Sequence, residues 1–433
     1  MQKATPEPAI ISRESFSKRS LNSPELLYFF HGLKVRAPRI WDFKHLYWAA
    51  VYYSPDLAEV KAQFHAVKAG EITAGQSPNP NISIIPTYDN STTPSAWLLG
   101  LGLNIPIETN GKREGRIAVA RQQSFSAQAQ IAGKAWDVRS RVLNAFIDVL
   151  IAKEAIDQTQ SLTGIQSQIN DIYANRAAQG QLPTALASQN QIVYQQTLLQ
   201  AEQSNADLLQ AQARLAGAIG VPVSAILAIK LDNHYPEFSR HLPSRKKALL
   251  ENPAIASALS DYRAAHENLR LELAKQIPDL GIGPGYEWNN QQGGKISLGL
   301  SFNLPIMNNN EGPIAEAEAK RTLAARHLDT VQITVINAIE QAEASYASAT
   351  RELAQTGRVI GLQQEKQNQL NSMIKQSHVG NLPFLYARNE MQIAQLANIA
   401  VKARILKSQA LLEDALRQPL FGPVISFKTL NGE

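Results

Sequence analysis

The feature that most constrains this chain is an alternation of apolar with small or polar residues that occurs twice in the same setting. The first copy ends in Asn104-Ile-Pro-Ile107 and the second in Asn303-Leu-Pro-Ile306, and each leads through a polar loop into a long helical pattern. Prolines and glycines around the copies repeat with nearly one offset: 253−55=198, 278−80=198, 305−106=199, 380−180=200 and 383−183=200. The sequence therefore predicts an internal duplication.

The duplication indicates one architecture of two similar halves, although 433 residues would suffice for two or three ordinary domains. We expect an irregular segment at 1–40, a first repeat at 41–220, a connecting segment at 221–251, a second repeat at 252–418 and a tail at 419–433. Helices are expected at about 55–69, 115–176, 183–219, 253–276, 313–377 and 383–417, and strands at about 81–89, 95–105, 279–288 and 295–304. The predicted fold class is mainly α with membrane β-strands.

The four strands are expected to form two hairpins, each with one apolar face. Glycine, serine and asparagine lie on the opposite face, which is typical of strands between lipid and a polar lumen. The lipid-facing residues would include Leu99, Leu101, Leu103, Leu298, Leu300 and Phe302. Pro86 and Pro284 interrupt the pattern, and since proline cannot donate to a ladder we expect a bulge or a locally open edge there. A soluble α+β protein with two amphipathic hairpins is the competing interpretation.

Four strands cannot close a membrane barrel, because such barrels need at least ~8 strands. Open edges in lipid would leave backbone groups unpaired. Several chains must therefore share one barrel: two chains would supply eight strands and three would supply twelve. Small residues on the lumen side favour the larger barrel, which leaves an open channel.

The helical segments are unusually long, and the second carries a coiled-coil seam. Its apolar residues follow spacings of three and four: Leu328, Val331, Val335, Ile339, Ala342, Tyr346, Ala349 and Leu353. Each long segment ends at a turn, Gly180-Gln-Leu-Pro183 or Gly380-Asn-Leu-Pro383. Glycine suits a left-handed C-cap, and proline suits the first turn of a returning helix.

Composition excludes several classes of function. The net charge of +5 is spread along the chain without a dense basic block, so no nucleic-acid partner is expected. There are no cysteines, and no apolar run reaches 18 residues. The eight histidines are scattered, and Gly281-Ile-Gly-Pro-Gly285 lacks the Lys-Ser/Thr of a phosphate loop. We expect no catalytic residues, metal site or cofactor, and interpret the chain as a conduit rather than an enzyme.

The order of these elements resembles the TolC-type outer-membrane efflux proteins, or outer membrane factors. The resemblance covers about 41–419, and its markers are Ser54-Pro-Asp-Leu57, Asn252-Pro-Ala-Ile255, the two Asn-x-Pro-Ile junctions, Ile219-Gly-Val-Pro222 and the two Gly-x-Leu-Pro turns. It implies a homotrimer with a 12-stranded barrel in the outer membrane, continued by a long α-helical coiled-coil tunnel in the periplasm. Its implied partners are a periplasmic adaptor (membrane fusion protein), an inner-membrane pump and outer-membrane lipid.

Two features bear on this resemblance. Gly111-Lys-Arg-Glu-Gly-Arg116 resembles the heavy-metal cation efflux branch, which implies metal cations as cargo. Met1–Ser20 shows neither a signal peptide nor the N-terminal cysteine that anchors many relatives to lipid. Read alone, that segment favours a cytosolic protein; a trimmed or mis-started exported protein is the alternative.

The candidate functional residues lie near the turns. Small and apolar residues there would contact the adaptor: Gly180, Leu182, Pro183, Val379, Gly380, Leu382 and Pro383. Leu182 and Leu382 are expected to be exposed. A threefold ring of Asp171 is a candidate gate, with a solvated charge on a helix face as the alternative. Alternative functions are the outer-membrane conduit of a type I secretion system and a soluble coiled-coil scaffold.

Overall fold

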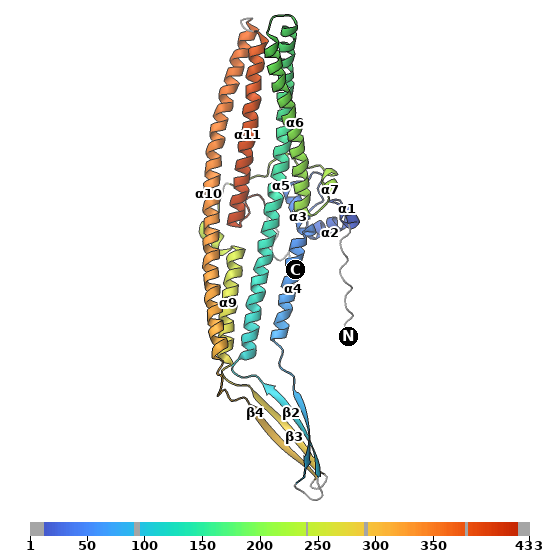
Figure 1. Ribbon diagram of the computed structural model, residues 1–433, viewed down its shortest axis with the longest axis vertical. Helices are drawn as coiled ribbons and strands as arrows, with labels where there is room; N and C mark the ends of the chain where they lie inside the picture. Colours follow the sequence, from blue (N-terminus) through green and yellow to red (C-terminus); the bar gives the residue numbers. More distant parts are fainter. Residues whose placement is uncertain (1–12, 91–95, 240, 290–292, 377–379, 423–433) are drawn as a thin grey trace. The chain divides into compact units, whose positions relative to one another are not determined.

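The structure is a computed structural model, and residues 13–90, 96–239, 241–289, 293–376 and 380–422 are described (Figure 1). The chain forms two compact units. One comprises 1–58, 134–249 and 335–433, and the other comprises 59–133 and 250–334. The boundary falls inside two very long helices, α5 (Lys112–Ala178) and α10 (Glu311–Lys375), so each unit holds part of both.

One antiparallel sheet of four strands forms much of the second unit. Its order is β1 (Asn81–Asp89), β2 (Ala96–Ile107), β3 (Leu280–Asn289) and β4 (Gly293–Phe302). The sequence predicted the hairpins β1–β2 and β3–β4 but not the pairing of β2 with β3 that joins them. Side chains alternate between faces along a strand. The register therefore gathers the predicted apolar residues on one face, in rows such as Ile84, Leu101, Tyr286 and Ile296.

The sequence predicted a bulge or a locally open edge at each strand proline; neither proline causes a bulge, and the second alternative is found. Pro86 pairs with Leu99 in an unbroken register, and it lies on the edge strand β1, where an outward-facing position needs no N–H. Pro284 also keeps the register, pairing with Leu298. On its other side, however, two consecutive residue pairs are missing from the β2–β3 ladder at Pro284. The gap lies between the pairs Gly102↔Gly285 and Ile105↔Ile282. A locally open ladder is thus found at Pro284 alone.

Two helices, α4 (Pro55–Ala74) and α9 (Pro253–Ala274), begin where the sequence predicted helix starts. α4 follows Ser54, whose Oγ accepts a hydrogen bond from Leu57 N at 3.2 Å. α9 follows Asn252, whose Oδ1 accepts from Ala254 N at 2.9 Å. Each side chain satisfies a backbone N–H that a helix start leaves unpaired, and proline at the first position needs no partner.

The first unit is helical. Besides its parts of α5 and α10 it contains α1 (Arg13–Ser17), α2 (Pro24–Gly32), α3 (Phe43–Tyr53), α6 (Thr184–Ile219), α7 (Val223–Leu227), α8 (Arg245–Leu250) and α11 (Asn381–Leu416). The expectation of an irregular segment at 1–40 is wrong for α1 and α2. Ser23 caps α2 by accepting from Leu26 N, and Leu26 and Phe30 are buried. Burial of one apolar face thus stabilises a helix of only nine residues.

A buried ion pair holds α5, α11 and a segment near the C-terminus together. Arg139 on α5 donates to Glu413 on α11 at 2.6 Å, and their side chains are 1% and 2% exposed. The guanidinium also donates to the carbonyls of Phe421 and Gly422, at 2.9 and 3.2 Å. Glu413 accepts in turn from Leu420 N and Phe421 N, at 2.6 and 2.7 Å. Every charge is paired and hydrogen-bonded, as burial requires.

The seam predicted on α10 is the face that this helix buries. Ile339, Ala342 and Ala349 are buried, and the other seam residues are half-buried. A second set of apolar residues lies off the seam and is exposed: Leu323, Ile333, Ile336, Val359, Leu362 and Met373. None of the described helices is long and apolar enough to cross a membrane.

Candidate functional sites

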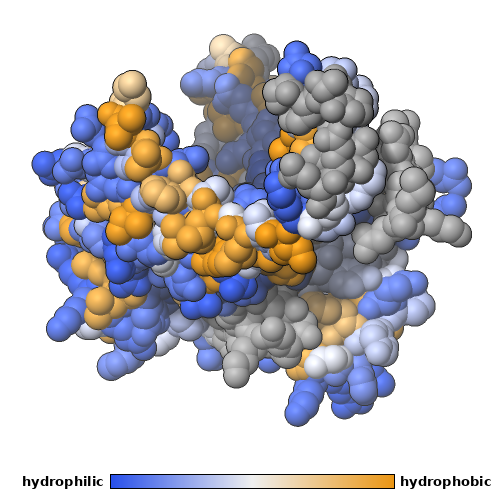
Figure 2. All heavy atoms as spheres, turned by 90° about the horizontal axis from the view of Figure 1, so that it is seen from below, coloured by the Kyte–Doolittle hydropathy of each residue, from blue (hydrophilic) through white to orange (hydrophobic). Residues whose placement is uncertain are grey.

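The sheet exposes its apolar face and leaves both edges open. All six residues predicted to face lipid lie on that face; Leu103 is half-buried and the other five are exposed. Within the described residues β1 and β4 each pair with a single strand. Figure 2, viewed from below, shows hydrophobic residues gathered in a band across this view of the protein. Large exposed apolar patches and unpaired strand edges are typical of surfaces that bind a partner or a membrane.

The opposite face of the sheet is polar and crowded by small residues. Ser301 Oγ donates to Asn104 Oδ1 at 3.4 Å across the face, and both lie beside Gly281. At Gly283 any side chain would collide with the backbone carbonyl of Leu103, so the chains approach there as only glycine permits. Glycine in these strands therefore makes room for neighbouring polar groups, in agreement with a polar lumen side.

The loop after each Asn-x-Pro-Ile motif contains an equivalent asparagine, Asn110 or Asn310, and both contact the same helix end. Asn110 and Asn310 both have positive φ, 55° and 61°, in the left-handed region that asparagine tolerates better than most residues. Asn110 Nδ2 donates to the carbonyl of Ala274 at 3.1 Å, and Asn310 Nδ2 donates to that of Glu272 at 2.7 Å. Both carbonyls lie in the last turn of α9, where they lack intrahelical partners. Both junctions thus cap the same helix.

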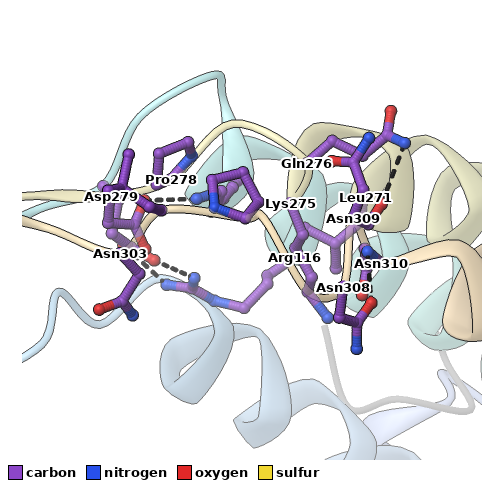
Figure 3. Close-up of a pocket in the computed structure, with 14 residues that line it drawn as sticks. Arg116, Leu271, Lys275, Gln276, Pro278, Asp279, Asn303, Asn308, Asn309 and Asn310 are labelled. Carbon is purple, nitrogen blue, oxygen red and sulfur yellow. Dashed lines mark hydrogen bonds and ion pairs between the residues drawn. The ribbon is translucent and has the colours of Figure 1, made fainter.

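Ion pairs at these junctions line an open cavity of about 520 Å³ (Figure 3). Lys112, which is buried, donates to Asp279 at 2.6 Å, and Arg116 pairs with Glu108 through both carboxylate oxygens. Burial opposes ionisation of Asp279, but hydrogen bonds from Lys112 and the Thr109 N–H outweigh it, so its pKa lies below the ordinary value.

The Arg116 hydrogen bonds likewise lower the pKa of Glu108. Both carboxylates are therefore charged at neutral pH. The sequence singled out 111–116 only through a family resemblance and missed its partners, because Asp279 lies 167 residues away from Lys112.

The two helix turns differ in structure although their sequences match. Gly180 follows α5 with a φ of 71°, as the predicted left-handed cap. Gly380 instead is the N-cap of α11, with a φ of −68° and a ψ of 168°, so the left-handed prediction is wrong there. Pro183 is the N-cap of α6, whereas Pro383 lies within the first turn of α11. Val379 lies outside the described residues.

The leucines at the turns are half-buried, so the expectation that they are exposed is wrong. Leu382 packs against a buried cluster of Ile165, Ile169 and Leu385, which joins α5 to α11. Leu182 is half-buried as well, whereas Pro183, Gly380 and Pro383 are exposed.

Beside this cluster, the hydroxyls of Tyr173 and Tyr386 share a hydrogen bond of 2.8 Å. Burial, together with that bond, raises the pKa of Tyr386 to about 12. Asp171, the candidate gate, lies two residues before Tyr173 on α5 and is exposed. The described residues contain no group of three or more histidine, aspartate or glutamate side chains that could hold a metal ion.

The chain thus combines a four-stranded sheet that exposes an apolar face with two helices of 67 and 65 residues. The chain belongs to the outer membrane efflux protein family, whose family model matches residues 47–221 and 245–416. This family consists of efflux proteins, in agreement with the interpretation of the chain as a conduit.

Metal-resistance proteins are among the relatives. The chain is 26% identical over 275 residues to the cobalt-zinc-cadmium resistance protein CzcC of Cupriavidus metallidurans, covering 60% of this chain and 62% of CzcC. It is 25% identical over 323 residues to the nickel and cobalt resistance protein CnrC of the same organism, covering 71% of this chain and 74% of CnrC. The match to CzcC thus spans about three fifths of that protein.

Solved structures share the fold. The outer membrane protein VceC of Vibrio cholerae superposes with a TM-score of 0.71 at 16% identity, over 87% of this chain and 96% of that chain. CusC, described in terms of transmembrane channel formation, superposes with a TM-score of 0.70 at 16% identity, over 86% and 91%. The outer-membrane channel OprN gives a TM-score of 0.73 at 14% identity, over 88% and 91%.

Proposed function

We propose that three copies of this chain form a 12-stranded barrel in the outer membrane, continued by a helical tunnel in the periplasm. The observation that carries the proposal is the four-stranded sheet with an exposed apolar face and two unpaired edges. In lipid each unpaired backbone group costs several kcal/mol, so the edge of β1 needs the edge of β4 from another copy. Three copies supply twelve strands, enough for an open pore.

The exposed apolar residues of α10 support the same assembly. Leu323, Ile333 and Leu362 lie off the seam and are exposed. A second copy packed on this face would bury them, which favours association in the helical part as well as in the barrel. The assembly is tested by native mass spectrometry of the protein extracted in mild detergent. The expected species is a trimer; a monomer or dimer would overturn the proposal.

Within that trimer the chain would act as the outer-membrane channel of a tripartite efflux system. Substrate would pass passively from an inner-membrane pump and a periplasmic adaptor to the exterior. The support is membership of an efflux family.

The cargo proposed is divalent or monovalent metal cations. Gly111–Arg116 resembles the heavy-metal branch, and relatives at 25–26% identity are named for resistance to cobalt, zinc, cadmium and nickel. A deletion strain should lose tolerance to one or more of zinc, cobalt, cadmium, nickel, copper and silver, and the cloned gene should restore it. Unchanged metal tolerance with altered drug tolerance would reassign the cargo.

The helix turns are proposed to contact the adaptor. Their exposed residues Gly180, Pro183, Gly380 and Pro383 form a small-residue surface that a helical hairpin can approach closely, with Leu182 half-buried beside it. Leu182→Glu should reduce adaptor cross-linking and efflux while the trimer persists. Gln195→Glu adds the same charge to an exposed position of α6 away from the turn and should change neither. Normal cross-linking in Leu182→Glu would remove the docking role.

Asp171 is proposed to act as a cation-selective ring. Its exposed carboxylate would occur three times around the tunnel, and rings of carboxylates favour cations. Conductance in planar bilayers is the test: Asp171→Asn should lower cation over anion selectivity, whereas Glu202→Gln, another exposed carboxylate, should not. Equal selectivity in the wild type and both variants would make Asp171 an ordinary solvated charge.

A further inference from the structure

The cavity at the junctions lies where the apolar strands end. Glu108 follows β2 directly, Asp279 directly precedes β3, and Asn303 directly follows β4. The register pairs Ile107 with Leu280 and Leu280 with Phe302, so these three polar residues come together at one end of the sheet. With the apolar face in lipid, this level is where the hydrocarbon layer gives way to headgroups.

The charges around the cavity balance one another. Lys112 pairs with Asp279, and Arg116 pairs with Glu108. Lys275, whose side chain is partly exposed, pairs with Glu272 at 2.7 Å. Each of these three cations thus has a carboxylate partner; Glu108 and Asp279 line the cavity with them, whereas Glu272 lies outside its lining. A ligand that carries both a positive and a negative charge matches such a lining better than an ion of one sign, because it leaves no net charge behind.

Hydrogen-bond donors remain free in the same cavity. Among the described residues, the side-chain amides of Asn303, Asn308 and Asn309 donate no hydrogen bond, although Asn308 Oδ1 accepts from Asn310 N at 2.8 Å. The Lys275 ammonium has three N–H groups and donates one of them to Glu272. Figure 3 shows these residues around the opening. Such donors suit the oxygens of a phosphate group.

Apolar residues continue from the cavity into the open. Leu304 and Pro305 line it, and the side chains that follow β4 are strongly exposed: Leu304 is 67%, Ile306 77% and Met307 93% accessible. Large apolar side chains this exposed, next to a polar cavity, need an apolar partner. Acyl chains beside a bound headgroup would provide one.

We propose that this cavity binds the headgroup of a zwitterionic phospholipid of the phosphatidylethanolamine type, from the inner leaflet of the outer membrane. Lys275 and the asparagine amides hold the phosphate, Glu108 and Asp279 face the ammonium, and the acyl chains lie along Leu304 and Ile306. A volume of about 520 Å³ accommodates such a headgroup, within the ~300–1,000 Å³ usual for ligand sites. The inference rests on the membrane insertion argued under the proposed function.

The test uses purified, delipidated full-length protein in detergent, titrated with phosphatidylethanolamine and followed by native mass spectrometry. We expect up to three lipids to be retained per trimer. Asn308→Asp keeps the accepted hydrogen bond but sets a negative charge against the phosphate, and it should weaken retention at least about tenfold. Asn337→Asp adds the same charge at an exposed position of α10 outside the cavity and should bind as the wild type does.

Each other outcome overturns the inference in a recognisable way. A trimer that retains no lipid, or equal retention in Asn308→Asp and the wild type, would exclude a headgroup site here. Displacement of the lipid by millimolar inorganic phosphate would mean that the cavity takes a free anion. Cross-linking of Met307→Cys to a second copy without lipid binding would show that a neighbouring subunit fills the cavity. Failure to observe a trimer at all would instead count against the proposed function.

Discussion

The buried pair of Arg139 and Glu413 allows a sharp test, because α5 carries a second, exposed arginine pair two residues away. Replacing Arg139 with methionine would leave the Glu413 carboxylate, 2% exposed, with only the N–H groups of Leu420 and Phe421 as partners. Breaking a buried pair in this way costs ~3–5 kcal/mol. Arg141 pairs with Asp56 at 2.9 Å but is 50% exposed, so its loss should cost ~0–1 kcal/mol.

These costs translate into different melting temperatures. At ~2.1 cal/mol/K per residue, a cooperative transition of this chain has an unfolding entropy of ~0.9 kcal/mol/K. Arg139→Met should therefore lower Tm by ~3–5 °C and Arg141→Met by ~1 °C or less. Circular dichroism of the detergent-solubilised protein at 222 nm measures both.

Adding Glu413→Gln to Arg139→Met should recover part of the loss, because the orphaned charge is removed. Equal melting of the two single variants would refute the claim that this pair holds the C-terminal segment onto the helices.

Three further predictions concern the sheet and its junctions. Leu300→Arg should prevent membrane assembly, at a cost of ~2–4 kcal/mol near the bilayer midplane, whereas Ser301→Asp on the polar face should insert normally. The measurement is the amount of heat-modifiable trimer in outer-membrane fractions. Equal amounts from the two variants would mean that the lipid-facing and polar faces are wrongly assigned. Gly283→Val should abolish trimer recovery because its side chain meets the Leu103 carbonyl, and recovery at the wild-type level would contradict that close approach. The pKa of Asp279 lies below its ordinary value of 3.8, so the stability that the carboxylate adds is present above that pH and is lost as the pH falls through the lower native pKa. Asp279→Asn should therefore have a lower Tm than the wild type at pH 7, and the difference in Tm should shrink below pH ~3.8. A difference in Tm that does not change with pH would exclude this role of the carboxylate.

The local features of this fold could be predicted from sequence, because they depend on short-range periodicity. Alternation at Leu298, Leu300 and Phe302 fixes one face of β4 whatever its neighbours are. The pairing of β2 with β3 joins segments more than 170 residues apart, for which no local signal exists. The helix that begins at Pro24 was missed although it did have a local signal, because Ser23-Pro24 matches the helix start recognised at Ser54-Pro55.

The candidate sites were harder to predict for the same reason. The sequence shows Leu382 beside a turn, but its burial depends on Ile165 and Ile169 of another helix. Gly180 and Gly380 both open a Gly-x-Leu-Pro motif, yet only the first has positive φ, so similar short motifs adopt different conformations in different surroundings. The junction cavity combines Lys112 with Asp279, and only the fold brings these residues together.

We expect the open edges of β1 and β4 to pair between copies of this chain, and engineered cysteines test this pairing directly. The chain contains no cysteine, so any disulfide must come from the introduced pair. Each variant would carry one cysteine on β1 and one on β4, and would be oxidised in intact outer membranes. The β1 positions are Ser83, Ile85 and Thr87, and the β4 positions are Lys295, Ser297 and Gly299. For cysteine pairs in register we expect disulfide-linked dimers and trimers, but no higher species. Only monomers across the whole set, in protein that reaches the membrane, would contradict it.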